Sequence, residues 1–135
     1  MLADALATHL EWPDVLAYPY AVDADDSLLE KIATGIARGI TISTPGFYAP
    51  QGRRLRLEPF DNEINDNITS FSFRGQRITN YEMESSAIYG LSKLMNHKAL
   101  TVCVVIGNRV TGEFLNEYKP AIKDLAAQVL EGLSS

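Results

Sequence analysis

The sequence has 135 residues, 46% hydrophobic and 21% charged, a balance typical of one globular domain over residues 1–135. Its formal net charge of -5 argues against nucleic acid or an anionic membrane surface as a partner, because both select for basic residues. The single cysteine, Cys103, excludes an intrachain disulfide and a cysteine-based zinc site. The N-terminus lacks the pattern of a signal peptide, and no apolar stretch reaches the roughly 18 residues of a membrane span, so we expect a cytoplasmic protein.

The first half of the chain shows two helical patterns and one strand pattern. The first dozen residues predict a short helix that Pro13 ends. Ser27 opens a capping-box pattern, and apolar residues at helical spacing continue it to Gly39, a plausible left-handed stop. Residues 40–44 are short and rich in β-branched side chains, which favours a strand.

The second half alternates in the same way. Helices are predicted over residues 61–70 and 85–95, with a strand over 78–81 between them. Residues 99–106 are apolar on both sides, as in the middle of a parallel sheet, where the Cys103 thiol would be buried and inert. A last helix has Pro120 in its first turn, and its inward stripe is expected to be Ile122, Leu125, Ala126, Val129, Leu130 and Leu133.

Alternation of helices and strands predicts an α/β fold with three αβα layers and a mainly parallel or mixed sheet. Only three strands are visible in the pattern, which is few for this architecture and leaves the outer edges unprotected. We therefore expect the chain to be part of a larger sheet.

Three polar segments follow the predicted strands, at residues 44–53, 80–86 and 107–109. In open α/β sheets, ligands bind beyond the carboxyl ends of the strands, so these segments are the candidate site. Convergence of three segments on one sheet edge is a better signal than any single motif.

The first segment offers groups that suit a flat heterocycle. Phe47 can stack on a ring, Gln51 has a donor and an acceptor on one plane, and Arg53 can donate to a carbonyl oxygen. This set fits a pyrimidine base. A solvated surface loop is an equally weighted alternative.

The second segment places Glu82 and Glu84 on either side of Met83, just before an apolar helix. One glutamate could accept hydrogen bonds from a sugar diol, or both could serve only as helix-capping partners. A glycosidase pair is disfavoured, because residues two apart in a strand point the same way and leave no gap for substrate. His9 and His97 lack ligand-spaced partners, which favours structural roles.

These segments resemble those of a known family. Residues 39–53, GITISTPGFYAPQGR, resemble the base-binding loop of uridine phosphorylases, and residues 80–90, NYEMESSAIYG, resemble their ribose-binding segment. Residues 100–109 resemble the strand that follows. On these motifs the chain is identified as a member of the nucleoside phosphorylase type I superfamily. From about Trp12 onward it resembles the carboxyl-terminal half of the full-length family members.

The resemblance implies roles at the base. Phe47 would lie against the uracil ring, Gln51 would bond the imide nitrogen and a neighbouring carbonyl, and Arg53 would donate to the other carbonyl. Asn108 and Arg109 would close the back of this site.

At the sugar, the resemblance implies that Met83 packs under the ribose and that Glu84 accepts its hydroxyls. Glu82 would lie near the base edge in a supporting role, which completes the substrate-binding set.

The reaction implied is reversible attack of phosphate on the ribose anomeric carbon of uridine, giving uracil and ribose 1-phosphate. The transition state would have oxocarbenium character, with Arg53 and Glu84 as the catalytic residues and Gln51 helping to stabilise charge on the departing base. Phosphate would be a co-substrate, no metal or organic cofactor would be needed, and family members form homo-oligomers.

One departure from the family pattern generates alternatives. The family's phosphate-binding groups belong to its first half, and this sequence has no matching segment. A catalytically incomplete fragment that needs a complementary N-terminal half is therefore the alternative, and we expect the chain alone to lack activity. A nucleosidase is disfavoured, because residues 106–109 lack the acidic side chain that purine-specific relatives place there.

Overall fold

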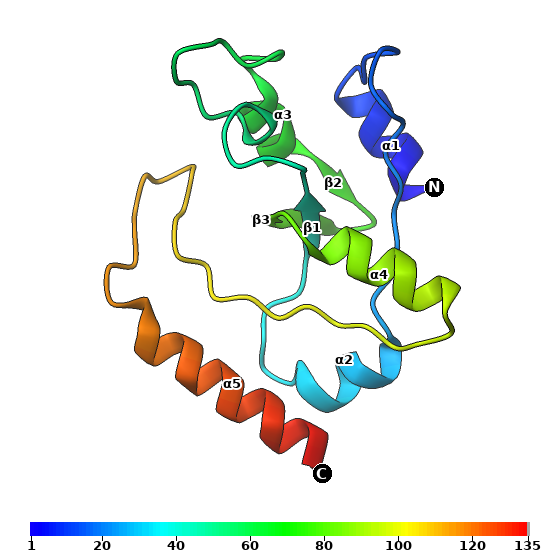
Figure 1. Cartoon of the computed structure of the whole chain (residues 1–135), viewed down its shortest axis with the longest axis vertical. Helices are drawn as coiled ribbons and strands as arrows, with labels where there is room; N and C mark the ends of the chain where they lie inside the picture. The colour runs from blue at the N-terminus through cyan, green and yellow to red at the C-terminus, as the bar shows by residue number, and fades with distance from the viewer. Residues whose placement is uncertain (135) are drawn as a thin grey trace. The chain divides into compact units, whose positions relative to one another are not determined.

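The computed structural model describes residues 1–134 (Figure 1). These residues form two compact units. The first unit contains Met1–Val22 and Gly39–Ala87, and the second contains Asp23–Arg38 and the chain from Ile88 onward. None of the helices within residues 1–134 combines the length and apolar character that crossing a membrane requires. A single domain over 1–135 stays a prediction.

Two helices of the first unit build its small apolar core. Helix α1 spans Leu2–His9, and helix α3 spans Ile64–Ser70, both inside their predicted ranges. The buried apolar residues of this unit are Ala7, Leu10, Ile68 and Phe71. His9 joins the helices, since its Nε2 atom lies 2.8 Å from the Asn67 carbonyl oxygen and its ring packs edge-on against Phe71.

The sheet of the first unit is small and mixed. Strand β1 (Ile40–Ser43) pairs in parallel with strand β3 (Gln76–Glu82), and β2 (Ser72–Phe73) pairs antiparallel with the other edge of β3. The strand order is therefore β1-β3-β2, with β3 in the centre. This arrangement agrees with the predicted α/β class and mixed sheet.

The β2–β3 hairpin was not predicted from sequence. Arg74 and Gly75 form its two-residue turn with φ of 51° and 79°, the left-handed pair that a type I′ turn requires. Two residues in β2 are too few to show strand alternation, and the apolar pattern over 78–81 marks only part of β3. Gly75 is therefore the main sequence signal for this chain reversal.

In the second unit, helix α2 spans Asp26–Ile32, so its predicted limits at Ser27 and Gly39 are wrong. Asp25 is the N-cap, because its carboxylate accepts the Leu28 amide at 3.1 Å. The helix ends at the C-cap Ala33, and Gly35 takes the left-handed conformation with φ of 76° in the turn that follows.

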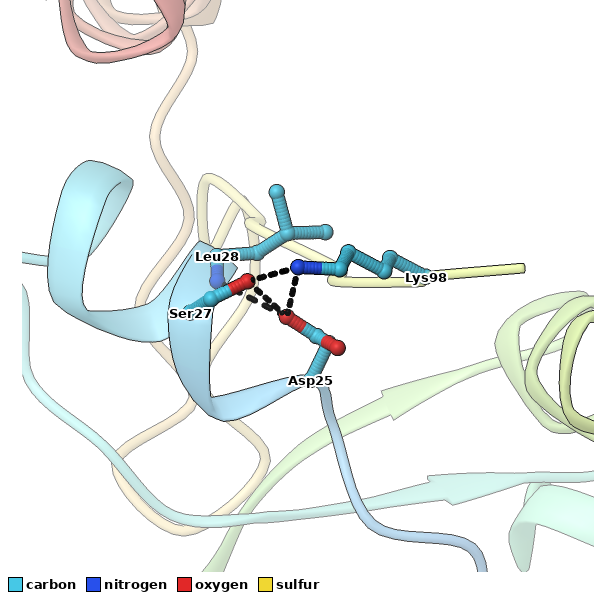
Figure 2. Close-up of polar contacts among 4 residues, drawn as sticks. All are labelled: Asp25, Ser27, Leu28 and Lys98. Carbon is cyan, nitrogen blue, oxygen red and sulfur yellow. Dashed lines mark hydrogen bonds and ion pairs between the residues drawn. The ribbon is translucent and has the colours of Figure 1, made fainter. Parts of the chain in front are cut away.

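Asp25 also holds the segment at Lys98 and Ala99, which follows helix α4 (Ser85–Leu94) (Figure 2). The Ser27 hydroxyl donates to its carboxylate at 2.5 Å, and the Lys98 ammonium group lies 3.8 Å from the same oxygen. The Asp25 amide donates to the Ala99 carbonyl at 3.0 Å. The Ser27 hydroxyl is the main cause of a lowered pKa for the Asp25 carboxyl.

The predicted strand over Ala99–Ile106 is wrong. A strand is held by its hydrogen-bond ladder, and none of the described residues forms one with Ala99–Ile106. The Ala99 carbonyl accepts the Asp25 amide, and an isolated bridge between Gly107 and Phe114 lies just beyond the segment. The Thr101 amide donates instead to the Tyr89 hydroxyl at 2.6 Å. Cys103 is exposed, so the expectation of a buried thiol is also wrong.

Helix α4 (Ser85–Leu94) begins in the first unit and continues into the second, close to its predicted range. Helix α5 (Tyr118–Ser134) packs on α2 with only part of the predicted stripe. Leu125 and Val129 of that stripe are half-buried, but Ile122, Leu130 and Leu133 are 45%, 64% and 51% exposed.

Gly132 explains which face of α5 meets α2. A Cβ atom at Gly132 would lie 2.7 Å from the Lys31 carbonyl oxygen, so the two backbones approach closely at this point. Gln128, one turn earlier, donates to the Thr34 carbonyl at 3.2 Å. Apolar periodicity predicts Leu125 and Val129 but not these two contacts, because a glycine and a polar residue make them.

We predict that Gly132→Ala lowers the free energy of unfolding by about 1 kcal/mol, although alanine is the better helix former by a similar amount. The added methyl group would force α5 away from Lys31. Urea unfolding followed by circular dichroism measures the effect. Ala126→Gly, at an exposed position of α5, gives the size of the helix-propensity term alone, and a more stable Gly132→Ala chain would contradict the close contact.

Candidate functional site

The two parallel strands of the first unit end at the same edge of the sheet. Their register places Ser43 of β1 beside Glu82 of β3, and the Thr44 amide continues the pairing with the Glu82 carbonyl at 3.1 Å. The segments after Ser43 and after Glu82 therefore leave the sheet side by side. This is the convergence that the sequence predicted for two of the three segments.

The carboxylate of Glu82 is the most heavily bonded group at this edge. Its Oε2 atom accepts the backbone amides of Glu84 at 2.8 Å and Ser85 at 2.7 Å. Its Oε1 atom accepts the Ser85 hydroxyl at 2.6 Å and also the Ser43 hydroxyl. The Ser43 oxygen in turn accepts the Ser86 amide at 2.9 Å, so two strand ends satisfy the first amides of α4.

This environment changes the pKa of Glu82. Burial raises it, but the hydroxyls of Ser43 and Ser85 and the amides of Glu84 and Ser85 outweigh burial, so the pKa lies below its ordinary value. Glu82 is therefore an anion at neutral pH. Sequence analysis missed Ser43 and Ser85 as partners; a serine ending one strand and another beginning the helix were the available signal.

Met83 and Glu84 lie on the exposed side of this turn. Met83 is 41% exposed, and the Glu84 carboxylate accepts the Met83 amide at 3.2 Å. Because Glu82 and Ser43 accept the first amides of α4, helix capping does not require the Glu84 side chain. Its carboxylate can accept hydroxyl groups from a ligand at the surface.

The three predicted base-site residues lie together in the loop after β1. The Arg53 guanidinium carbon lies 3.6 Å from the centre of the Phe47 ring, a cation–π arrangement. Its Nη1 atom donates to the Phe47 carbonyl at 2.5 Å and to Gln51 Oε1 at 2.7 Å. Gln51 is 3% exposed, whereas Phe47 is 51% exposed, so the cluster has a buried amide and an accessible ring.

Gly52 fixes this loop on helix α3. The loop contains a short 3₁₀ helix, η1 (Ala49–Gln51), which Gly52 ends in the left-handed conformation with φ of 66°. A Cβ atom at Gly52 would lie 2.6 Å from Asn65 Nδ2 and 2.8 Å from Ile64 Cγ2. Glycine allows this approach in the left-handed conformation, which places the end of η1 against α3.

Asn108 and Arg109 belong to the second unit, and both are exposed. The Asn108 Oδ1 atom accepts the Val110 amide at 2.9 Å and the Thr111 amide at 3.2 Å, which closes a local turn. Their participation in the site of the first unit stays a prediction. Residues 1–134 hold no cluster of three or more His, Cys, Asp or Glu side chains placed to bind a metal ion.

Comparison with known proteins identifies the family. The family model of the phosphorylase superfamily matches residues 4–133. The chain belongs to this superfamily. The predicted membership and the predicted type of fold are therefore confirmed.

Two relatives give more detail. Uridine phosphorylase of Thermococcus kodakarensis is 35% identical over 102 residues, covering 72% of this chain and 36% of the relative. A crystal structure of Trypanosoma brucei nucleoside phosphorylase, described as showing uridine phosphorylase activity, matches with a TM-score of 0.75 and 26% identity. That match covers 86% of this chain and 44% of the other, so the chain spans less than half the length of both relatives.

We predict that Glu82→Gln lowers the free energy of unfolding by about 1–3 kcal/mol at pH 7, since it removes the charge that four donors share. The folded pKa of Glu82 lies below the ordinary value of 4.5, so its stabilisation is fully present above that pH. It is lost as the pH falls through the lowered folded pKa.

Urea unfolding of both chains between pH 7 and pH 3 measures this difference. The gap between them should narrow below about pH 4.5. Asp66→Asn, at an exposed carboxylate on α3, is the matched control and should show little difference at any pH. A gap that stays constant in acid would show that the Glu82 charge contributes nothing.

Proposed function

We propose that this chain carries the base and ribose site of a uridine phosphorylase, which converts uridine and phosphate reversibly to uracil and ribose 1-phosphate. The observation that carries the proposal is the cluster of Phe47, Gln51 and Arg53 in the loop after β1. Strand β1 pairs with β3, which ends at Glu82 just before Met83 and Glu84. The similarity to a uridine phosphorylase and to a nucleoside phosphorylase with that activity supports it.

At the base, the exposed Phe47 ring is the stacking surface, and Gln51 and Arg53 supply in-plane hydrogen bonds. Arg53 lies on Phe47 in this structure, so a base would take its place on the ring while the guanidinium turns to a carbonyl oxygen. Negative charge grows on the departing uracil, and the Arg53 cation stabilises it there. Asn108 and Arg109 close the back of the base site in this proposal.

At the sugar, Glu84 accepts the ribose hydroxyls and Met83 packs under the ring. A diol donates hydrogen bonds, and a carboxylate is an acceptor-only group that makes stronger bonds than a neutral partner. The Glu82 carboxylate supports both residues through the backbone of this turn. Arg53 and Glu84 are thus the proposed catalytic pair.

Phosphate is the co-substrate, and the proposed reaction needs no metal or organic cofactor. The relatives have more than half of their length outside the matched region, and we propose that family segments there supply the phosphate donors. Such segments complete the enzyme as a complementary N-terminal half. A homo-oligomer in the cytoplasm is part of the same proposal.

We predict a preference for pyrimidine over purine ligands. Competitive binding of uracil and hypoxanthine to the complete enzyme containing these residues should favour uracil, because the Phe47, Gln51 and Arg53 set matches the imide edge. The same enzyme should release uracil from uridine only when phosphate is added. Tighter binding of hypoxanthine, or release that is independent of phosphate, would reject the proposed function.

We predict that Glu84→Gln lowers kcat/KM for uridine by about tenfold to a hundredfold, the value of a hydrogen bond to a charged group. The unfolding midpoint should stay within experimental error, because Glu82 and Ser43 accept the first amides of α4. Steady-state kinetics and urea unfolding measure the two effects. A loss of stability in proportion to the loss of turnover would assign Glu84 to the helix terminus alone.

A further inference from the structure

We propose that Glu82 is a positioning residue that sets recognition of the ribose hydroxyls by holding Met83 and Glu84, and that it does not touch the base. This inference rests on the proposed function, because it assigns the origin of selectivity at the same site. The family resemblance places Glu82 near the base edge; the contacts of its carboxylate in the structure point to the sugar side.

The Glu82 carboxylate has only a few positions that can accept hydrogen bonds. An ionised carboxylate has about four lone-pair positions and no proton to donate. Four donors already occupy Glu82, two on each oxygen: the Ser43 and Ser85 hydroxyls on Oε1 and the Glu84 and Ser85 amides on Oε2. A uracil N–H group has no acceptor position left at this carboxylate.

The four hydrogen bonds of the Glu82 carboxylate restrain the backbone around Glu84. Glu82 Oε2 holds the amides on both sides of the Glu84 α-carbon, since it binds the Glu84 and Ser85 nitrogens at 2.8 and 2.7 Å. Fixing these two amides fixes the backbone from which the exposed Glu84 carboxylate extends. The bond to Ser43 joins the same turn to the end of β1, from which the base-site loop begins.

The charge of Glu82 matters as well as its shape. In Glu82→Gln, the side-chain nitrogen would face the two hydroxyls in place of Oε1. The Ser43 and Ser85 oxygens lie 3.1 Å apart, so one hydroxyl proton can go to the other oxygen, but the second loses its acceptor. The hydroxyl side of the network must then rearrange. The remaining uncharged oxygen accepts the Glu84 and Ser85 amides more weakly than a carboxylate does, so the restraint on the Glu84 backbone is loosened.

The test compares uridine with 2′-deoxyuridine in the complete enzyme that contains these residues. Glu82→Gln should reduce the ratio of their kcat/KM values about tenfold, because the substrate that lacks a hydroxyl depends less on Glu84. Uracil affinity, measured by calorimetry, should stay within about twofold. A smaller folded fraction scales both substrates equally, so a merely structural role leaves the ratio unchanged.

Controls separate the possible outcomes. Asp66→Asn, the matched change on α3, should leave the ratio and the affinity unchanged. Ser85→Ala removes only one donor and should lower the ratio less, which provides a second variant if Glu82→Gln does not fold. An unchanged ratio overturns the inference, and a loss of uracil affinity with an unchanged ratio assigns Glu82 to the base.

A second measurement keeps this inference separate from the proposed function. In the 135-residue chain with labelled methionine methyl groups, Glu82→Gln should shift or broaden the Met83 signal and leave Met1 and Met95 unchanged. An unaltered Met83 signal overturns the positioning role. If the wild-type enzyme does not act on uridine, the proposed function fails, and the Met83 signal still decides whether Glu82 holds this turn.

Discussion

The Glu82 carboxylate joins the ends of strands β1 and β3 to the first turn of helix α4. Helix α4 begins directly after β3, and its first amides need acceptors from outside the helix. Glu82 and Ser43 supply them from the ends of two parallel strands. Hydrogen bonds to a charged group contribute about 1.5–3 kcal/mol each, so this one group is a large part of the local stability.

The parallel pairing of β1 and β3 is what makes this arrangement possible. Only parallel neighbours bring two carboxyl-terminal ends to one edge, and the register places Ser43 opposite Glu82 at that edge. The two candidate site segments therefore start side by side, one from each strand. The exposed Glu84 can serve a ligand because its neighbour two residues earlier serves the helix.

Features that depend on local sequence could be predicted. Helices α1, α3 and α4 have apolar spacing that the chain itself contains, and the motifs around Gln51 and Met83 fix the order of the site segments. Helix α2 shows the limit of local rules, because both Asp25 and Ser27 can cap a helix and the choice involves Lys98, 71 residues away from Ser27. Its end was misplaced at Gly39, whereas the chain already leaves the helix at Ala33.

Features that depend on partners could not be predicted. The segment Ala99–Ile106 has the composition of a central strand, but composition cannot supply the neighbouring strands that hold one. The close contact of α5 with α2 depends on Gly132, because only a residue without a side chain leaves room for the Lys31 carbonyl. The bonds of Ser43 and Ser85 to Glu82 likewise exist only through register, which a sequence pattern does not state.

In the proposed function, the loop that holds Phe47, Gln51 and Arg53 connects ligand binding with selectivity. Arg53 already has a ring, a carbonyl and an amide oxygen as partners, all within residues 47–51. A ligand that takes its place must offset a cation–π contact of about 0.5–2 kcal/mol and at least one charged hydrogen bond. A flat apolar ring would replace only the contact with Phe47. A base with carbonyl oxygens replaces both the stacking and the acceptors, while Gly52 keeps Gln51 in place against α3. Under the proposed function, selectivity for such a base would therefore follow from the contacts that the loop makes with itself.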